Sequence, residues 1–547
     1  MRNKGKKRMM FLLVVASVIG FSGCSYQKES KATAQASSVV NLMEQSEIGS
    51  MDTLSTQDTA SINAQVNVFD GLYQIDDTNK VAPAIAKDFP NISDDGLTYT
   101  ITLREDATWS HGEPVTAKDF IYAWQRLATP ANQANYMFLL DGTFKNGTEI
   151  INGEKDPSEL GAKATDEYTI EIQLEQPVPY LTSILAFTPF FPQNEAFVTE
   201  KGDAYGTSSE NILTNGPFLM KNWDQASSTW DLEKNEDYYN RDAIKLENIH
   251  YEVIKEAVTG YNLFNEGQLD MADIYGEYVK QNAANEELQT VLTSYIHYFK
   301  MNQKRDGKDT IFANENVRKA VYYAIDKEAL VKDVLSDGSE AINGFIPNNF
   351  VFNPETGKDF REDAPLEGPD KATALAYWQK ATADIGDKIS IEMLTKDTDA
   401  DKKVAEFIQD QLQTVLPGLT VEIKSVPLNN SIELTRKSDY ELAIGTWGPD
   451  YQDPMTYLYN LVSPNNTNYE NKDYDQLIAD SNTTYANDLA TRWDTMIKAE
   501  KLLVEETAGI VPIYQRARSI MVNPSLKGVY YPTFGPSTII KYAYMEE

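Results

Sequence analysis

The residue with the clearest chemical potential is Asp450, in the stretch Tyr440–Asn460 (YELAIGTWGPDYQDPMTYLYN). The apolar run Leu442–Ile444 predicts a buried strand, and Gly448 and Pro449 end it just before the acid. Ligands in open α/β sheets sit beyond the carboxyl ends of strands. A partly desolvated carboxylate at this position, beside aromatic residues, would anchor a cationic group. The alternative is a surface aspartate in a tight turn, where this residue is common.

Pairs of acids raise a second possibility, because two carboxylates can serve as the acid and base of a hydrolase. The sequence offers Glu105 with Asp106, and Asp450 with Asp453. Adjacent acids on surface turns are usually only solvated, however. No GxSxG, HExxH, P-loop or GxGxxG pattern occurs in the context that its chemistry requires. We therefore predict a binding protein and not an enzyme.

Composition restricts the partners and cofactors. The chain has 547 residues, enough for three or four domains, and a formal net charge of −33. A negative field of that size disfavours binding to nucleic acid. With one cysteine and three histidines, neither an intrachain disulfide nor a Cys/His metal cluster is expected. We predict no metal and no cofactor.

The single cysteine, Cys24, lies at the end of a targeting segment. Five positive charges precede an apolar run from Met9 to Phe21, which is too short for a stable membrane anchor, and Ser22-Gly23-Cys24 follows. This pattern resembles a bacterial lipobox, although Phe21 stands where an aliphatic residue is usual. The resemblance implies a lipoprotein signal peptide over residues 1–24 and a lipid on Cys24. An ordinary secretory signal or an uncleaved anchor is the alternative. Residues 25–38 have little to bury and are expected to be a flexible tether.

Two further regions carry clear patterns of secondary structure. The segment Leu103–Arg126 predicts a strand, a Trp-containing turn and a helix with Thr116 as its N-cap. Trp109 and His111 within it are interpreted as packing and turn residues. Farther along, a long amphipathic helix is expected over Val317–Leu335. Strands then alternate with helices over residues 370–447, which predicts parallel pairing in a βαβ lobe.

The motif GTWGPDYQDPMTYL resembles the strand and loop of family 5 extracytoplasmic solute-binding proteins, the oligopeptide-binding (OppA) family of ABC importers. In that family the acid of the "DY.(D/E)P" context pairs with the α-ammonium group of a peptide, and here it is Asp450. Further stretches resemble the family in the same order: LREDATWSHGEPVTAKDFIYAWQR, TNGPF, FNEGQLD, VRKAVYYAIDKEALVKDVL and GIVPIYQRARSIMV.

The resemblance implies an α/β, two-lobed, periplasmic-binding-protein-like fold (type II, cluster C) with an extra subdomain in the first lobe. Two crossovers are expected to connect the lobes, near Asn302–Asp306 and near Ile513–Arg518. The expected division follows. Lobe I comprises residues 39–70, 206–300 and 516–547, the inserted subdomain residues 71–205, and lobe II residues 301–515.

The implied function is an extracellular, lipid-anchored receptor that binds oligopeptides between its lobes and delivers them to the permease of an ABC transporter. We expect a monomer at the outer face of the cell membrane of a Gram-positive bacterium. The implied peptide-binding residues are Glu47, Ile48, Gly49, Thr446, Trp447, Gly448 and Asp450. Alternatives within the family are a signalling peptide such as a sex pheromone, a dipeptide, haem or a nickel complex.

Overall fold

The computed structural model describes residues 39–56 and 58–546. The predicted lipid site at Cys24 and the predicted tether, residues 25–38, lie outside this part of the chain. Within the described residues, no helix is both long enough and apolar enough to cross a membrane.

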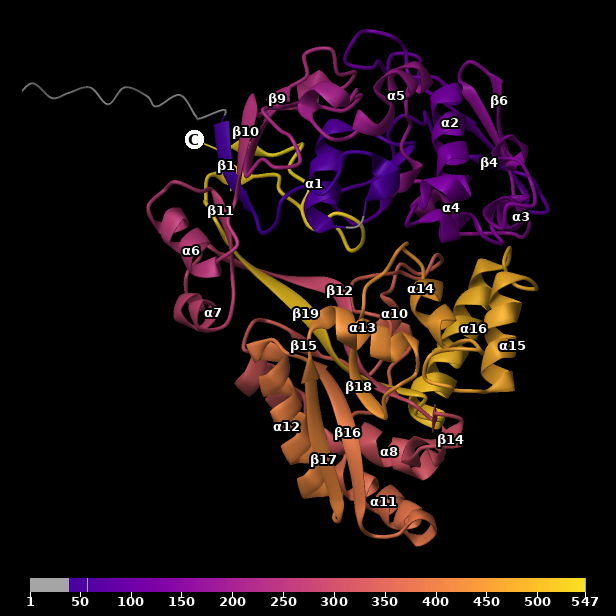
Figure 1. Cartoon of the computed structure of the whole chain (residues 1–547), viewed down its shortest axis with the longest axis vertical. Coiled ribbons are helices and arrows are strands. Elements are labelled where there is room, and N and C mark those ends of the chain that lie inside the picture. The colour runs from indigo at the N-terminus through magenta and orange to yellow at the C-terminus, as the bar shows by residue number, and fades with distance from the viewer. Residues whose placement is uncertain (1–38, 57, 547) are drawn as a thin grey trace, which may run out of the picture.

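Two long strands join an upper and a lower lobe (Figure 1). They are β12 (Leu288–Met301) and β19 (Ile510–Val522), which pair antiparallel. They form the middle of one sheet that continues into both lobes. The sheet continues on both sides of this pair with β11 (Met271–Ile274), β18 (Leu442–Trp447), β16 (Ile389–Lys396) and β17 (Leu419–Val426). The spatial order of these strands is β11-β19-β12-β18-β16-β17.

The upper lobe has a second sheet with the order β1-β10-β9-β8. Its strands are β1 (Val39–Glu44), β10 (Asn248–Val253), β9 (Thr229–Lys234) and β8 (Phe218–Lys221). Val40 and Leu42 of β1 are buried, because alternate side chains of a strand face the same side. The C-terminal tail returns to this lobe, where Lys541 Nζ lies 2.9 Å from the buried carboxylate of Asp70.

Beside this sheet, a unit with its own hydrophobic core carries the sheet β4-β5-β7-β6. Its strands are β4 (Asn91–Ile92), β5 (Thr98–Thr102), β7 (Thr169–Gln173) and β6 (Ala162–Asp166). Helix α2 (Ala117–Ala128) begins with the predicted N-cap, because Thr116 and Asp119 form a reciprocal capping box. Trp109 is 1% exposed, as a packing residue should be.

The lower lobe confirms the alternation of strands and helices. β16 pairs in parallel with both β17 and β18. Helices α12 (Asp399–Val415) and α13 (Leu428–Arg436) pack against these strands. The lobe also contains α11 (Lys371–Ile385), α15 (Lys472–Asn482) and α16 (Leu489–Lys501).

The prediction of one continuous helix over Val317–Leu335 was wrong. Helix α8 (Glu315–Ala324) ends early, and a new helix begins at α9 (Lys327–Ala329) and continues through the π-helical residues Leu330–Leu335. The break follows from Asp326, whose side chain accepts a hydrogen bond from the backbone N–H of Ala329 and so caps a separate helix.

The first crossover lies earlier than expected. The pairing of β12 with β19 shifts register between Leu292 and Ile296. Residues 296–301 pair with β18, and their buried side chains pack in the core of the lower lobe. Asn302 is fully buried there, with its Nδ2 2.8 Å from the carbonyl oxygen of Tyr440. We therefore place the first crossover at residues 293–295 instead of Asn302–Asp306. In β19 the same register shift leaves Arg516 unpaired, and we place the second crossover there.

Candidate functional site

The site is built at the carboxyl end of β18. One edge of this strand pairs with β12 over its whole length, whereas the other edge pairs with β16 only at Leu442 and Ala443. Residues 444–447 therefore have an edge that no strand within the described chain covers. An open strand edge presents unpaired backbone groups, so another extended chain can add to it.

The side chains around this edge have structural tasks. Trp447 Nε1 donates to the carbonyl oxygen of Thr456 at 2.9 Å. Thr446 Oγ1 lies 3.3 Å from Nδ1 of the buried His297. A Cβ atom at Gly448 would lie 2.4 Å from the ring of Tyr295, so any other residue would require that ring to move.

Asp450 follows directly. Its backbone N–H donates to Thr456 Oγ1 at 3.1 Å, which holds the turn. Among residues 39–56 and 58–546, its carboxylate has neither an ion pair nor a hydrogen bond. Burial raises the pKa of this carboxyl to about 6. An acid that is desolvated and unpartnered is costly in the empty protein. A cationic ligand group would remove that cost.

The carboxylate lines a cavity of about 540 Å³, which we term the anchor cavity. The lower lobe contributes Trp447, Asp450 and Tyr459, and the inserted unit contributes Phe138 and Tyr180. Phe138 and Tyr459 are more than half exposed, which is unusual for aromatic rings and is typical of a binding surface.

A second cavity of about 370 Å³, the crossover cavity, begins at Pro449, on the other side of the loop. It is lined by the end of β1, by the crossover residues 293–295, by Arg516 and Arg518 of β19, and by residues 531–537. The prediction missed these residues. The available signal was the alternation of two arginines, Arg516 and Arg518, in the strand IYQRARSIMV, whose ends are apolar.

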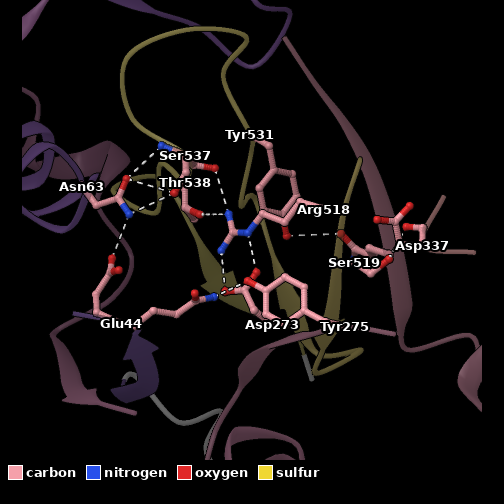
Figure 2. A network of polar contacts seen from close by, with 12 residues as sticks. Glu44, Asn63, Asp273, Tyr275, Asp337, Arg518, Ser519, Tyr531, Ser537 and Thr538 are labelled. Carbon is pink, nitrogen blue, oxygen red and sulfur yellow. Dashed lines mark hydrogen bonds and ion pairs between the residues drawn. The ribbon is translucent and has the colours of Figure 1, made fainter. Parts of the chain in front are cut away.

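Arg518 is held by a dense polar network (Figure 2). Its guanidinium is bidentate with Asp273, with a distance of 2.9 Å between Nη2 and Oδ2. It also donates to the carbonyl oxygen of Ser537 at 3.0 Å and to Thr538 Oγ1 at 2.6 Å. Asn63 connects Ser537 to Glu44, since its Nδ2 donates to Glu44 Oε1 at 2.8 Å.

Residues 47–49 line none of the cavities described above. Ile48 is a core residue with 1% exposure, and Glu47 forms an exposed ion pair with Lys255. The backbone N–H of Gly49 donates to Ser61 Oγ, and its carbonyl oxygen accepts from Gln225. The segment that does reach the crossover cavity is residues 44–46, because β1 ends at Glu44. Contact between residues 47–49 and a peptide remains a prediction.

In each acid pair considered as catalytic, one acid is held by an arginine. Asp453 forms a bidentate pair with Arg492, with distances of 2.7 and 2.8 Å, and both side chains are buried. Asp106 pairs at the surface with Arg104. Within the described part of the chain, no group of three or more His, Cys, Asp or Glu side chains is arranged to hold a metal ion.

The loop that carries Asp450 touches both sides of the cleft. Tyr451 stacks on Tyr180 of the inserted unit, with ring centroids 4.5 Å apart. The backbone N–H of Gln452 donates to Ser183 Oγ at 2.6 Å, and its side-chain amide donates to the carbonyl oxygen of Asn79. A ligand bound at Asp450 would therefore be enclosed by both parts of the molecule.

Two lobes, two crossovers and a cavity lined by both lobes are typical of a two-lobed solute-binding protein. The chain belongs to the family described as bacterial extracellular solute-binding proteins, family 5, whose middle region matches residues 80–469.

Individual relatives agree with this assignment. A dipeptide-binding protein of Lactococcus lactis subsp. cremoris is 30% identical over 515 residues, which are 91% of this chain and 93% of that protein. The structure of Listeria monocytogenes OppA bound to peptide is similar at a TM-score of 0.75 and 40% identity, covering 93% of this chain and 99% of that one. The pheromone receptor PrgZ is similar at a TM-score of 0.77 and 37% identity, covering 93% and 100%.

Proposed function

We propose that the protein is a receptor that encloses peptides between its lobes and anchors their α-ammonium group on Asp450. The observation that carries the proposal is a desolvated carboxylate without a partner among the described residues, directed at a cavity between the lobes. The names of the relatives, which include dipeptide-binding and peptide-bound proteins, support the same ligand class.

The peptide backbone would pair with the open edge of β18 at residues 444–447. Backbone amides and carbonyls are the same in every peptide, so this pairing gives affinity that does not depend on sequence. Thr446 and Trp447 would contribute through their main-chain atoms, since their side chains bond to other neighbours, and Gly448 has only main-chain atoms to offer. Ligand side chains would enter the anchor and crossover cavities, where aromatic rings and water complete the contacts.

Closure of the lobes about the two crossovers would enclose the ligand between them. We further propose that the receptor acts as a monomer and delivers its peptide to the permease of an ABC importer. A lipid on Cys24 would hold it at the outer face of the membrane of a Gram-positive cell. Replacing Cys24 by Ala should then leave the precursor unprocessed or release it from the membrane fraction. Unchanged processing and fractionation would overturn the anchor.

A signalling peptide is the second candidate ligand, and the similarity to the pheromone receptor PrgZ favours it. Both candidates are peptides, so one experiment addresses them together. Native mass spectrometry of the receptor purified from its own cells should show bound masses that fragment as peptides. A mixture of many masses would favour nutritional uptake, and one dominant mass would favour signalling. Bound species that do not fragment as peptides, with no calorimetric response to peptide libraries, would refute peptide binding.

A further inference from the structure

Arg516 and Arg518 lie on the same strand and line the same cavity, yet only one of them has partners. The guanidinium of Arg518 is fully occupied by Asp273, Ser537 and Thr538, as Figure 2 shows. Arg516 is exposed, and its guanidinium makes no hydrogen bond and no ion pair with the described residues. Only its carbonyl oxygen is bound, by Thr293 Oγ1 at 2.7 Å.

Neither carboxylate that lines this cavity pairs with Arg516. Asp273 is neutralised by Arg518. Glu44 accepts from Asn63, and burial raises its pKa to about 7, so it is largely uncharged under mildly acidic conditions. An unpaired guanidinium in a cavity lined by tyrosines is therefore open to an anion from outside the chain.

The register places Arg516 near the proposed ammonium anchor. Gln515 and Trp447 both pair with Ile296, from opposite sides of β12. Two strand spacings separate them, which is about 10 Å. Because β18 and β19 each run antiparallel to β12, they point in the same direction. β18 ends at Trp447, whereas β19 continues through Arg516 beyond the crossover residues.

The charges of Arg516 and Asp450 both act on the hydroxyl of Tyr295. Burial raises the pKa of Tyr295, the positive charge of Arg516 lowers it, and the negative charge of Asp450 raises it further. Pro449 lines the cavity of Arg516, while its neighbour Asp450 lines the anchor cavity. The cleft thus presents a negative and a positive group within the length of a short peptide.

We propose that Arg516 is the counter-charge for a carboxylate of the bound peptide. The inference rests on the proposed function, since it takes Asp450 as the anchor of the peptide N-terminus. An extended chain advances about 3.3 Å per residue, so a negative group within the first three or four residues comes within reach. The carboxylate can be the C-terminus of a short peptide or the side chain of an Asp or Glu in a longer one. Arginine suits either source, because its planar fork binds a carboxylate through two parallel hydrogen bonds.

The test compares peptides that differ only in this charge. One arm uses tri-alanine as the free acid and as the C-terminal amide. The other uses hexapeptide amides with Glu or Gln at position 2 or 3. Calorimetry with the natural protein should show tighter binding of the charged member in at least one arm, by roughly tenfold or more. Discrimination in the first arm identifies the C-terminus as the source, and discrimination in the second identifies an acidic side chain.

The variant Arg516→Gln should bind the uncharged peptides as before and lose the discrimination. Arg516→Lys should keep part of it, because the charge remains without the planar fork. Arg241→Gln is the matched control: it removes a similarly exposed cation whose nearest acid is Asp242 and that lies outside both cavities. Arg241→Gln should change neither the affinity for the uncharged peptides nor the discrimination between charged and uncharged ones.

The outcomes separate this inference from the proposed function. If the natural protein binds both members of each pair equally, or if Arg516→Gln discriminates as the natural protein does, the role of Arg516 is refuted while peptide binding stands. If no peptide of either arm binds to the natural protein, the proposed function fails first.

Discussion

Two aspartates three residues apart, Asp450 and Asp453, lie in the same loop but have opposite surroundings. Asp453 is 7% exposed and meets the buried guanidinium of Arg492 through two short hydrogen bonds. Asp450 is also desolvated, but no cation within the described chain faces it. Asp453 is therefore part of the fold, and Asp450 is available to a ligand. The same contrast separates Arg518 from Arg516, and in both pairs the partner comes from a distant part of the chain.

The largest expected effect is on stability, at the occupied acid. Replacing Asp453 by Ala leaves Arg492 buried without a counter-charge, which should lower the free energy of unfolding by roughly 3–5 kcal/mol. Denaturant unfolding of the purified variant measures this loss. Removing Arg492 as well, as Asp453→Ala with Arg492→Met, should restore part of the stability. An unchanged midpoint for the single variant would show that the pair contributes little.

At the unoccupied acid the expected effect is on affinity. Asp450→Ala should weaken peptide binding by about a hundredfold or more, since it removes the counter-charge of a desolvated ammonium group. Asp450→Asn should cost less, because its amide keeps part of the hydrogen bonding. Neither change should lower the unfolding midpoint, because the carboxylate has no partner in the empty protein. Calorimetry should show the loss of affinity, and thermal unfolding should show unchanged stability, which is the reverse of the result expected for Asp453→Ala.

An N-acetylated peptide isolates the interaction. It should lose comparable affinity for the natural protein and little more for Asp450→Ala, because the two changes remove the same pair. Full affinity for acetylated peptides would move the anchor elsewhere. Asp450 would then be a turn residue, as the alternative interpretation of the sequence has it.

The sequence alone predicts one half of this comparison. The strand, its break and the acid at residue 450 follow from local pattern, and so do the capping box of α2 and the parallel βαβ order of the lower lobe. Local pattern does not show which acid of DYQDP is neutralised, because Arg492 lies 39 residues beyond Asp453. The free Arg516 was missed for the same reason.

The position of the first crossover could not be predicted either. Residues 295–302 (YIHYFKMN) alternate as one uniform strand, and nothing in them marks a change of lobe. The change arises from pairing: β18 covers residues 296–301, whereas residues 288–292 pair with the far half of β19. Likewise, the sequence pattern allows Asp326 inside a helix. Only the structure shows that its side chain caps the helix that follows.

The pH dependence of peptide binding to the natural protein should show the titration of Asp450. Because burial raises the pKa of Asp450 to about 6, the carboxyl gains a proton below that pH and loses its attraction for an ammonium group. The dissociation constant should therefore rise about tenfold for each pH unit below 6, since binding must release that proton. Above about pH 8 the peptide N-terminus loses its own charge and affinity should fall again.

The Asp450→Asn variant is the control for the acidic limb of this profile. It should bind weakly with a flat response between pH 4.5 and 7. If the natural protein shows the same flat response, Asp450 does not bind a cation.

The smallest expected effect concerns Glu44, a partly buried acid whose surroundings are intermediate between those of Asp453 and Asp450. It accepts a hydrogen bond from Asn63 but has no ion pair with the described residues, and burial raises its pKa from 4.5 to about 7. Arg518 opposes this rise, while Asp273 and Asp58 add to it. The folded protein then holds the proton more tightly than the unfolded chain does. The stabilisation is complete below about pH 4.5 and is lost as the pH rises through 7, by an amount on the order of 1–3 kcal/mol. Glu44→Gln keeps a neutral partner for Asn63 at every pH, so its unfolding free energy should approach that of the natural protein at pH 4.5 and exceed it at pH 8. Denaturant unfolding at the two pH values gives the difference, and equal differences at both would show that Glu44 ionises normally.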